Sequence, residues 1–469
     1  MSTASRLLAR HVIALRHDDV PRDVRDHAIR LVADAIGAGI YGAGTVPGSA
    51  IHAEASGRYA TGACPVWGRA SGLPPAGAAL VNGAQAHAFE LDDYVPAGKT
   101  HPGTVIIPAA VAIAGDATSG EELITAIVAA YDVMCRVAFA LNPNSARGRG
   151  FHMTGISGPF GAAAVAGRLL GLDEDELTSA FGIAASFSAG IFAFSAEGAM
   201  TKPLHAGRAA EAGIVAAKLA REGLTGPTAA LEAEDGGLLK AVSDAPRPEE
   251  LTRDLGHRFD LAAAAIKPYP CCGSNHSSID AIRQLRTEHG LVADEIESIV
   301  VHNARGVVLQ CGFDYTGQGG PLEAQMSLQY CVAAAVADGA VRLEHFGARR
   351  TDADLLRLAH KVSFVVDEEI DRVYPRRFPA RVTVHLADGE TLAASIDAPL
   401  GTPEHPIDDA GLRRKFVDVT APSVGPADRH RLLDAINALD TPEPAGKVTT
   451  ILREIGALHR TTTDTEFEV

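Results

Sequence analysis

Side chains that can move a proton are frequent in the stretch 84–103. Glu90, Asp93 and Tyr94 follow one another at i, i+3 and i+4, so on a helix end they would share one face. A Pro-Ala-Gly turn then leads to His101. Carboxylates beside an imidazole can transfer a proton or fix the tautomer of the histidine. The alternative interpretation is an acidic helix terminus followed by an ordinary loop histidine.

Glycines are dense around His152, in the stretch 148–158. Glycine lets the backbone approach a ligand closely. We expect a helix that begins near Ser157, where amino-terminal N–H groups would favour an anion. The spacing matches neither G-x-G-x-x-G nor the Gly-Lys-Ser/Thr pattern that cradles phosphates, which disfavours a nucleotide. A glycine-rich turn between two helices is the alternative.

Two lysines each directly precede a proline. Lys202 lies just before a predicted helix, where the positive end of the helix dipole would repel it, and this mismatch favours a functional role. Lys267 opens a motif that continues through the adjacent thiols Cys271 and Cys272 to His276. Adjacent cysteines rarely ligate one ion well, and no second Cys/His pair has the spacing of a zinc site, so we expect no metal.

The composition bounds the class of protein. A chain of 469 residues is long enough for two domains, and 46% hydrophobic with 21% charged residues is typical of a globular protein. Lys and Arg number 42 against 58 Asp and Glu, which gives a net charge of −16. This charge argues against nucleic acid or an anionic membrane as the main partner. It allows an anionic substrate, because a local cluster of Lys and His can hold a carboxylate.

Targeting signals and cysteine usage indicate the compartment. The amino terminus lacks the apolar stretch and cleavage site of a signal peptide. No run reaches 18 apolar residues, and the longest candidate, 104–115, contains a proline, so we expect no membrane span. The six cysteines are too thinly spread for a disulfide framework. We therefore expect a cytoplasmic protein with reduced thiols.

The elements that must position these side chains change character near 243–254, a charged segment with two prolines. Before it, helical spacing and abundant small residues predict one helix after another, without strands. After it, 296–303 and a hairpin over 380–396 predict strands, while 277–289 and 323–337 predict helices. The pattern indicates a small α+β domain. From Pro406 the chain is helical again, and we expect this tail to pack on the first region.

Six segments, taken together and in order, resemble the MmgE/PrpD family. They are HAFELDDY with HPG at 101–103, GFHMTG leading into GPFGAAAVAGRLLGL, TKPLHAGRAAEAGIVAA, KPYPCCGSNH, AQMSLQY at 324–330, and LRRKF near the carboxyl end. Each segment alone is modest, but all six in this order are specific. The family includes 2-methylcitrate dehydratase, cis-aconitate decarboxylase and iminodisuccinate epimerase.

The resemblance implies a mainly α fold, in which both chain ends, 1–265 and 402–469, form a large all-helical domain and 266–401 forms an inserted α+β domain. It also implies a homodimer, no metal or organic cofactor, and an active site in the cleft between the domains. Carried over by position, the catalytic residues would be His101, His152, Asp93, Tyr330 and Cys272, and the substrate-binding residues would be Lys202, Lys267, Glu90, Tyr94 and His276.

The chemistry of this set agrees with carboxylate substrates. Two lysines and two histidines in one cleft would neutralise two or three carboxylates, and desolvation would strengthen each contact. A lysine beside a carboxylate oxygen also stabilises the charge that develops when the neighbouring carbon loses a proton. We therefore expect a cofactor-independent lyase for a small di- or tricarboxylate, first a hydro-lyase of the 2-methylcitrate dehydratase type. The alternatives are an epimerase or isomerase, a decarboxylase, and a non-catalytic dicarboxylate-binding protein.

Three positions depart from the family pattern. Glu90 and Tyr94 stand where the decarboxylase and dehydratase branches more often have Asp and Thr, and Cys272 stands where the decarboxylase branch has His. Cys272 can simply fill buried space. It can instead be an acid/base group that faces His101 or His152 across the substrate, with Lys267 lowering its pKa. Two bases on opposite faces of one carbon are what an epimerase needs.

Overall fold

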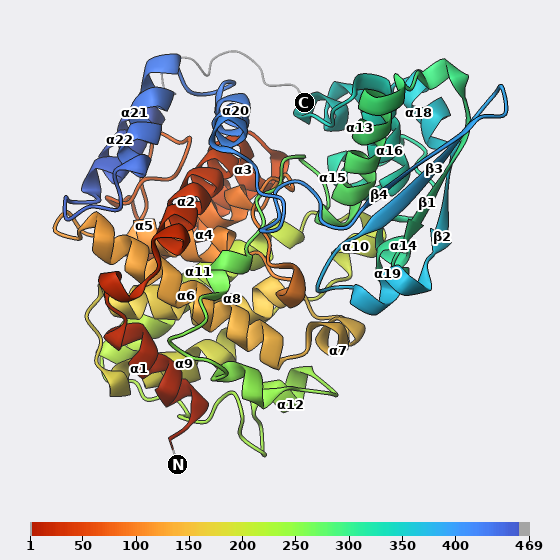
Figure 1. The fold of residues 1–469 in the computed structure, drawn as a ribbon. Coiled ribbons are helices and arrows are strands. Elements are labelled where there is room, and N and C mark those ends of the chain that lie inside the picture. The colour runs from red at the N-terminus through yellow and green to blue at the C-terminus, as the bar shows by residue number, and fades with distance from the viewer. Residues whose placement is uncertain (1, 459–469) are drawn as a thin grey trace.

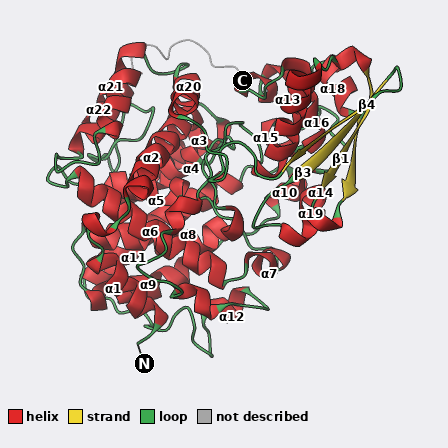
Figure 2. Ribbon diagram, viewed as in Figure 1, coloured by secondary structure: helices red, strands yellow, loops and turns green. Residues whose placement is uncertain are grey.

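The computed structural model describes residues 2–458 and consists mainly of helices, with one four-stranded sheet at one side (Figure 1, Figure 2). The mainly α class predicted from the sequence is confirmed. The predicted segment 402–469 extends beyond the described residues.

The helices that precede the sheet region run from the amino terminus to residue 242. They are α1 (Ala4–Ala14), α2 (Arg22–Gly42), α3 (Val46–Arg58), α4 (Pro75–Ala86), α5 (Gly103–Ile113), α6 (Gly120–Ala140), α7 (Pro143–Gly148), α8 (Met153–Leu169), α9 (Glu174–Phe187), α10 (Phe194–Glu197), α11 (Lys202–Arg221) and α12 (Leu238–Val242). Helix α2 shows why this region is helical: its apolar stripe, from Val24 through Ala28 and Leu31 to Ile36, is buried.

Three further helices return from the carboxyl end to this region. They are α20 (Asp409–Thr420), α21 (Pro426–Asn437) and α22 (Gly446–Leu458). Helices α20 and α21 pack on α2, so segments far apart in the sequence lie side by side (Figure 1). One hydrophobic core takes in residues from Leu8 to Ile266 and from Ile407 to Ile455, and a second takes in residues from Tyr269 to Ala394. The domain boundaries themselves stay a prediction.

The second core lies around the sheet. Its elements are α13 (His276–His289), β1 (Ile296–Asn303), α14 (Arg305–Cys311), α15 (Pro321–Met326), α16 (Leu328–Asp338), α17 (Leu343–Phe346), α18 (Ala353–Ala359), β2 (Val362–Val366), α19 (Glu368–Val373), β3 (Ala380–Leu386) and β4 (Thr391–Ile396). The strand order is β2-β1-β3-β4, with β1 parallel to β2 and the other pairs antiparallel. Along β3, Val382 and Val384 are buried while Arg381 is exposed, so one face of the sheet is covered.

The strand 296–303 and the hairpin over 380–396 match the sequence prediction, whereas three details differ. Strand β2 was not predicted, because its short apolar run lacks a regular alternation. The predicted helix 323–337 is two helices, since Ser327 caps α16 by accepting a hydrogen bond from the Tyr330 N–H. The helix expected near Ser157 already begins at Met153.

Helix α6 is the long apolar helix of the described residues. By length and composition it could cross a membrane, yet 94% of its most apolar window is buried inside the protein. It packs against α8 and α2, and its buried Asp132 and Arg136 contact the segment 253–260. We therefore interpret α6 as a core helix of the helical region.

Helices α4, α8 and α11 approach closely because glycines face their neighbours. A Cβ on Gly213 of α11 would clash with Ala162 and Ala163 of α8, whereas a Cβ on Gly57 of α3 would meet nothing within 4 Å. We predict that Gly213→Ala lowers the free energy of unfolding by about 1–3 kcal/mol through overpacking. The control Gly57→Ala, on an exposed helix, should be neutral or stabilising by up to about 1 kcal/mol. Denaturant titration measures both, and equal stability of the two variants would contradict this packing argument.

Candidate active site

A cavity of about 100 Å³ collects most of the residues singled out in the sequence. Its lining comes from both hydrophobic cores, with His101 and Lys202 from the helical region and Lys267 and Cys272 from the start of the sheet region. Glu90, Tyr94 and His152 also line it. The cavity thus gathers side chains as far apart in the chain as Glu90 and Phe378.

The carboxylate of Glu90 joins the two lysines. Lys202 forms an ion pair with its Oε1, and the Nζ of Lys267 lies 2.8 Å from its Oε2. All three side chains are buried. Burial, followed by the charge of Lys267, lowers the pKa of Lys202, while the contact with Glu90 favours its charged form. The expected convergence of the two lysines is therefore present, with a carboxylate of the protein between them.

The loop that carries Glu90 is not helical, so the expectation of a shared helix face was wrong. Helix α4 ends at Ala86, and Glu90 has a φ of 54°, in the left-handed region. Lys415 of α20 fixes this loop, because its Nζ donates to the Leu91 carbonyl at 2.6 Å and pairs with the buried Asp34 of α2. The family motif LRRKF thus has a structural role here, since its lysine holds the loop.

Asp92 connects two imidazoles and was not predicted as a site residue. Its Oδ2 lies 2.8 Å from Nδ1 of His87 and 2.7 Å from Nδ1 of His101. Nδ1 of His101 also lies 2.9 Å from the carbonyl oxygen of Asp93. Both neighbours of this nitrogen are acceptors, so Nδ1 carries the proton and Nε2 is the nitrogen left for chemistry. Despite burial, His87, Lys267 and His101 hold the pKa of Asp92 well below its usual range.

His87, Asp92 and His101 also form a group whose ligand atoms lie within 4.8 Å of one another, the spacing that a metal site needs. The sequence spacing did not reveal this group. In both histidines, however, the nitrogen nearest the others donates to Asp92, whereas a metal ligand must offer its lone pair. The hydrogen bonds therefore account for this group without an ion.

Asp93 is buried and does not line the cavity. Its carboxylate accepts hydrogen bonds from the Gly103 N–H at 2.9 Å and from the Tyr131 hydroxyl at 3.0 Å. Burial, with Asp92 and Asp34 nearby, raises the pKa of Asp93 to about 7. Because its backbone oxygen also accepts from His101, Asp93 positions the histidine and the start of α5, and the adjacent Asp92 makes the side-chain contact that we expected of it.

His152 is the N-cap residue of α8 and lines the cavity. Its Nδ1 lies 3.0 Å from Nδ1 of His205 on α11, and its ring meets the edges of Phe192 and Phe194. Burial lowers the pKa of His152 well below the ordinary value, and His87, His205 and His101 add to this effect. His152 is therefore a neutral imidazole in this site.

Cys272 lines the same cavity as these imidazoles and lies beside α14. Gln310 donates from Nε2 to its Sγ at 3.6 Å. A hydrogen bond from the Cys311 thiol lowers the pKa of Cys272 to about 5 against the effect of burial, and the charge of Lys267 contributes. The position is thus suited to a thiolate, as the acid/base interpretation requires.

Besides Asp93, two more predicted residues lie outside the cavity lining. The hydroxyl of Tyr330 donates to the carbonyl oxygens of His345 and Arg349 at 2.7 and 2.9 Å, inside the core of the sheet region. His276 is buried behind Tyr94, with its Nε2 3.3 Å from the Cys271 carbonyl oxygen. A packing role describes both better than contact with substrate.

Two cations in the lining were not predicted. Lys99 lies with its Nζ over the ring of Tyr374, and burial lowers its pKa to about 8. Arg147 at the end of α7 lies 3.6 Å above the ring of Phe192. Lys99 stands within the HAFELDDY–HPG segment, so its place in that motif is the only sequence signal that could have found it. Four cationic side chains and one carboxyl group, Glu90, therefore line the cavity.

Comparison with known families agrees with the fold and the site. The model of the MmgE/PrpD N-terminal domain matches residues 6–251, and that of the MmgE/PrpD C-terminal domain matches residues 269–441. The chain therefore belongs to the MmgE/PrpD family.

Three relatives indicate the class of reaction. The chain is 30% identical over 460 residues to the cis-aconitate decarboxylase-like protein oryM of Aspergillus oryzae. This match covers 92% of this chain and 94% of that protein. It is 30% identical over 431 residues to cis-aconitate decarboxylase of Aspergillus terreus, and this match covers 86% of each chain. It is 29% identical over 443 residues to cis-aconitate decarboxylase of Homo sapiens, and this match covers 90% of this chain and 89% of the human protein. Decarboxylases are lyases, so these relatives support a lyase-type function.

The state of Cys272 can be tested by alkylation. A thiolate already formed at neutral pH should react with iodoacetamide at a rate that is flat across the neutral range, whereas an ordinary thiol gains about tenfold per pH unit below its pKa. We expect this flat profile for Cys272, followed by peptide mass spectrometry. Cys64, whose pKa is raised by burial, is the internal control. A tenfold rise per unit at Cys272 would contradict the thiolate assignment.

Proposed function

We propose that this protein is a cofactor-independent lyase that acts on a small di- or tricarboxylate through a carbanion next to a carboxylate. The observation that carries the proposal is the cavity itself, which is lined by Lys202, Lys267 and His101, and the Nδ1 of this histidine is fixed by Asp92. Buried ammonium groups bind carboxylates strongly and stabilise the negative charge that develops on their oxygens. A histidine with one nitrogen fixed can give or take a proton at the other.

Decarboxylation of an unsaturated acid of the cis-aconitate type is the first candidate, because the relatives carry that activity in their names. The bond between the carbon chain and the leaving carboxylate breaks, and CO₂ departs. The electron pair stays on the carbon and is delocalised toward a carboxylate held by Lys202 or Lys267. Imidazolium His101 then gives the proton of its Nε2 to that carbon, and solvent restores the proton.

Dehydration, the first expectation from the sequence, is the second candidate. It needs a base for the proton and an acid for the leaving hydroxyl, and His101 and neutral His152 line the same cavity. An epimerase instead needs two bases on opposite faces of one carbon, and Cys272 is the group in the lining that could serve with His101. The homodimer, the cytoplasmic location and the absence of a cofactor belong to this proposal as well.

Glu90 limits how substrate binds. Each ammonium group has three N–H donors, and Glu90 occupies at least one on each lysine. A substrate carboxylate can therefore bind to the remaining donors, but it lies near the negative charge of Glu90. This arrangement favours a substrate whose carboxylates also reach Lys99 or Arg147, which line the same cavity.

Proton NMR in D₂O separates the candidate reactions in one experiment. We expect cis-aconitate-type acids to lose CO₂ and to gain one deuterium at the carbon that lost it. Loss or gain of water would indicate the hydro-lyase, and deuterium exchange without a change of formula would indicate the epimerase. Dialysis against a chelator should leave the rate unchanged. Binding of these acids without any of the three changes would identify a non-catalytic binding protein and contradict the proposal.

The lysines provide a mutational test of the site. Lys202→Met or Lys267→Met should raise KM by about 10- to 150-fold, the equivalent of about 1.5–3 kcal/mol for a hydrogen bond to a charged group. The matched control is Lys240→Met, which removes an exposed lysine paired with Glu234 at the surface. Thermal melting checks that each variant is folded. If both cavity variants keep wild-type kinetics, the two lysines do not bind substrate.

A further inference from the structure

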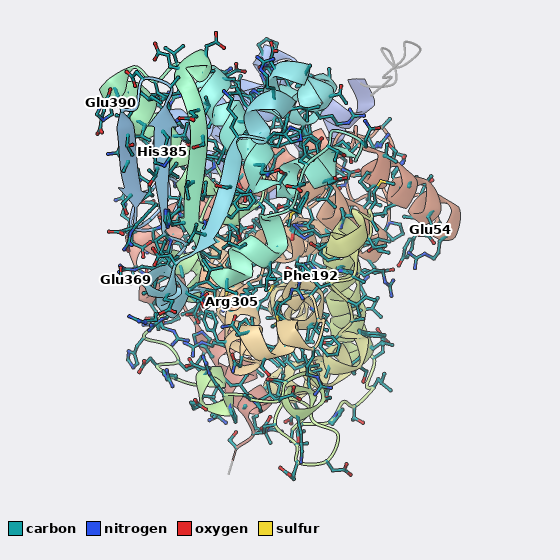
Figure 3. The ribbon with its side chains drawn as sticks, turned by 90° about the vertical axis from the view of Figure 1, so that its right-hand side faces the viewer. Glu54, Phe192, Arg305, Glu369, His385 and Glu390 are labelled. Carbon is teal, nitrogen blue, oxygen red and sulfur yellow. The ribbon has the colours of Figure 1, made fainter. Side chains whose placement is uncertain are left out.

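A second, larger cavity of about 890 Å³ adjoins the site. The two cavities share part of their lining, namely Arg147, Phe192, Phe194, Gln310 and Met326. One wall is the loop around Ile191 and Phe192, which precedes α10, and the other is α14 with the chain that follows it to α15. Figure 3 shows Phe192 beside α14, the helix that begins at Arg305. The outer cavity is therefore the mouth of the catalytic cavity.

Large apolar side chains line the mouth, whereas the two buried lysines lie in the inner cavity. Its lining includes Ile191, Leu309, Phe313 and Leu322, in addition to the shared Phe and Met side chains. Leu309 is 81% exposed and Ile191 is 62% exposed, values that are high for large aliphatic side chains in this protein. Apolar area left in water on both walls of one cavity favours a ligand that covers it.

Apart from Arg147, which also lines the inner cavity, the charged groups at the mouth are paired or repel an anion. Arg149 pairs with Asp244 at 2.8 Å, and Arg147 stacks on Phe192. Glu323 adds a carboxylate to the rim. Beyond Arg147, a further substrate carboxylate therefore meets no unpaired cation among the described residues of the mouth, whereas a hydrocarbon chain that starts in the inner cavity has apolar contacts along its path.

We propose that the substrate carries an aliphatic substituent of several carbons, which runs from the carboxylate-binding cavity into the mouth between Ile191 and Leu309. This inference rests on the proposed function for the position of the reacting carboxylates and extends it to the class of substrate. The inner cavity holds the polar head of an alkyl-substituted di- or tricarboxylic acid. The mouth selects for the chain and contributes binding energy away from the reacting atoms.

Calorimetric titration with succinate, butylsuccinate and hexylsuccinate tests the inference without requiring turnover. Each methylene buried should tighten binding about fourfold, the equivalent of about 0.8 kcal/mol. Affinity that is independent of chain length, or that falls with it, would overturn the proposal. If NMR shows turnover of unsubstituted acids while the length of the alkyl chain has no effect on affinity, the lyase function is supported and only the proposal of an alkyl substituent is wrong. If affinity rises with chain length but no acid is converted, binding of the alkyl chain in the mouth is supported and the lyase proposal fails.

A pair of variants locates the effect. Leu309→Asp should remove most of the gain between succinate and hexylsuccinate, whereas Leu224→Asp, at a leucine that is 51% exposed and outside both cavity linings, should keep it. Light scattering after size exclusion gives the oligomeric state of both. If Leu309→Asp dissociates an oligomer and leaves the chain-length dependence intact, the apolar mouth is an interface between copies and the inference is wrong.

Discussion

A single buried carboxylate, Glu90, sets the geometry on which the site depends. It meets Lys202 at the start of α11 and Lys267 at the entry to the sheet region, so it connects a helix of one core to the first residues of the other. Burying charges is expensive unless each has partners, and removal of one partner leaves the others uncompensated. The loop, the helix and the connecting segment therefore constrain one another, and the cavity between them has a defined shape.

The sequence predicted much of the fold because its signals are local. Strand 296–303, the hairpin and most helices follow from periodicity and turn residues, as in β3, where buried valines alternate with more exposed residues. The return of the carboxyl-terminal helices to the first region was expected, and the shared core is consistent with it. Strand β2 and the break at Ser327 were missed, because a short apolar run and one capping hydroxyl carry little periodic signal.

The site was predictable in its residue types but not in its geometry. Spacing placed Glu90, Asp93 and Tyr94 on one helix face, whereas the chain there turns through a positive φ at Glu90. As a result Asp92 faces the histidines and Asp93 faces Tyr131 and α5. Two adjacent aspartates cannot be assigned to opposite sides without knowing the turn. Tyr330 was predicted from its position in a family motif, but its side chain lies in the core of the sheet region and does not line the cavity.

The contact of Lys415 with the Leu91 carbonyl has a consequence for the order in which the protein becomes active. The loop that holds Glu90 and Asp92 is synthesised early, but the ammonium group that fixes it lies on α20, more than three hundred residues later. At about 5–20 residues per second, the ribosome needs on the order of tens of seconds to supply it. During that interval the nascent helices can pack, yet the loop lacks its anchor. Enzymatic competence thus comes late in translation, after the inserted region has emerged and the chain has come back on itself.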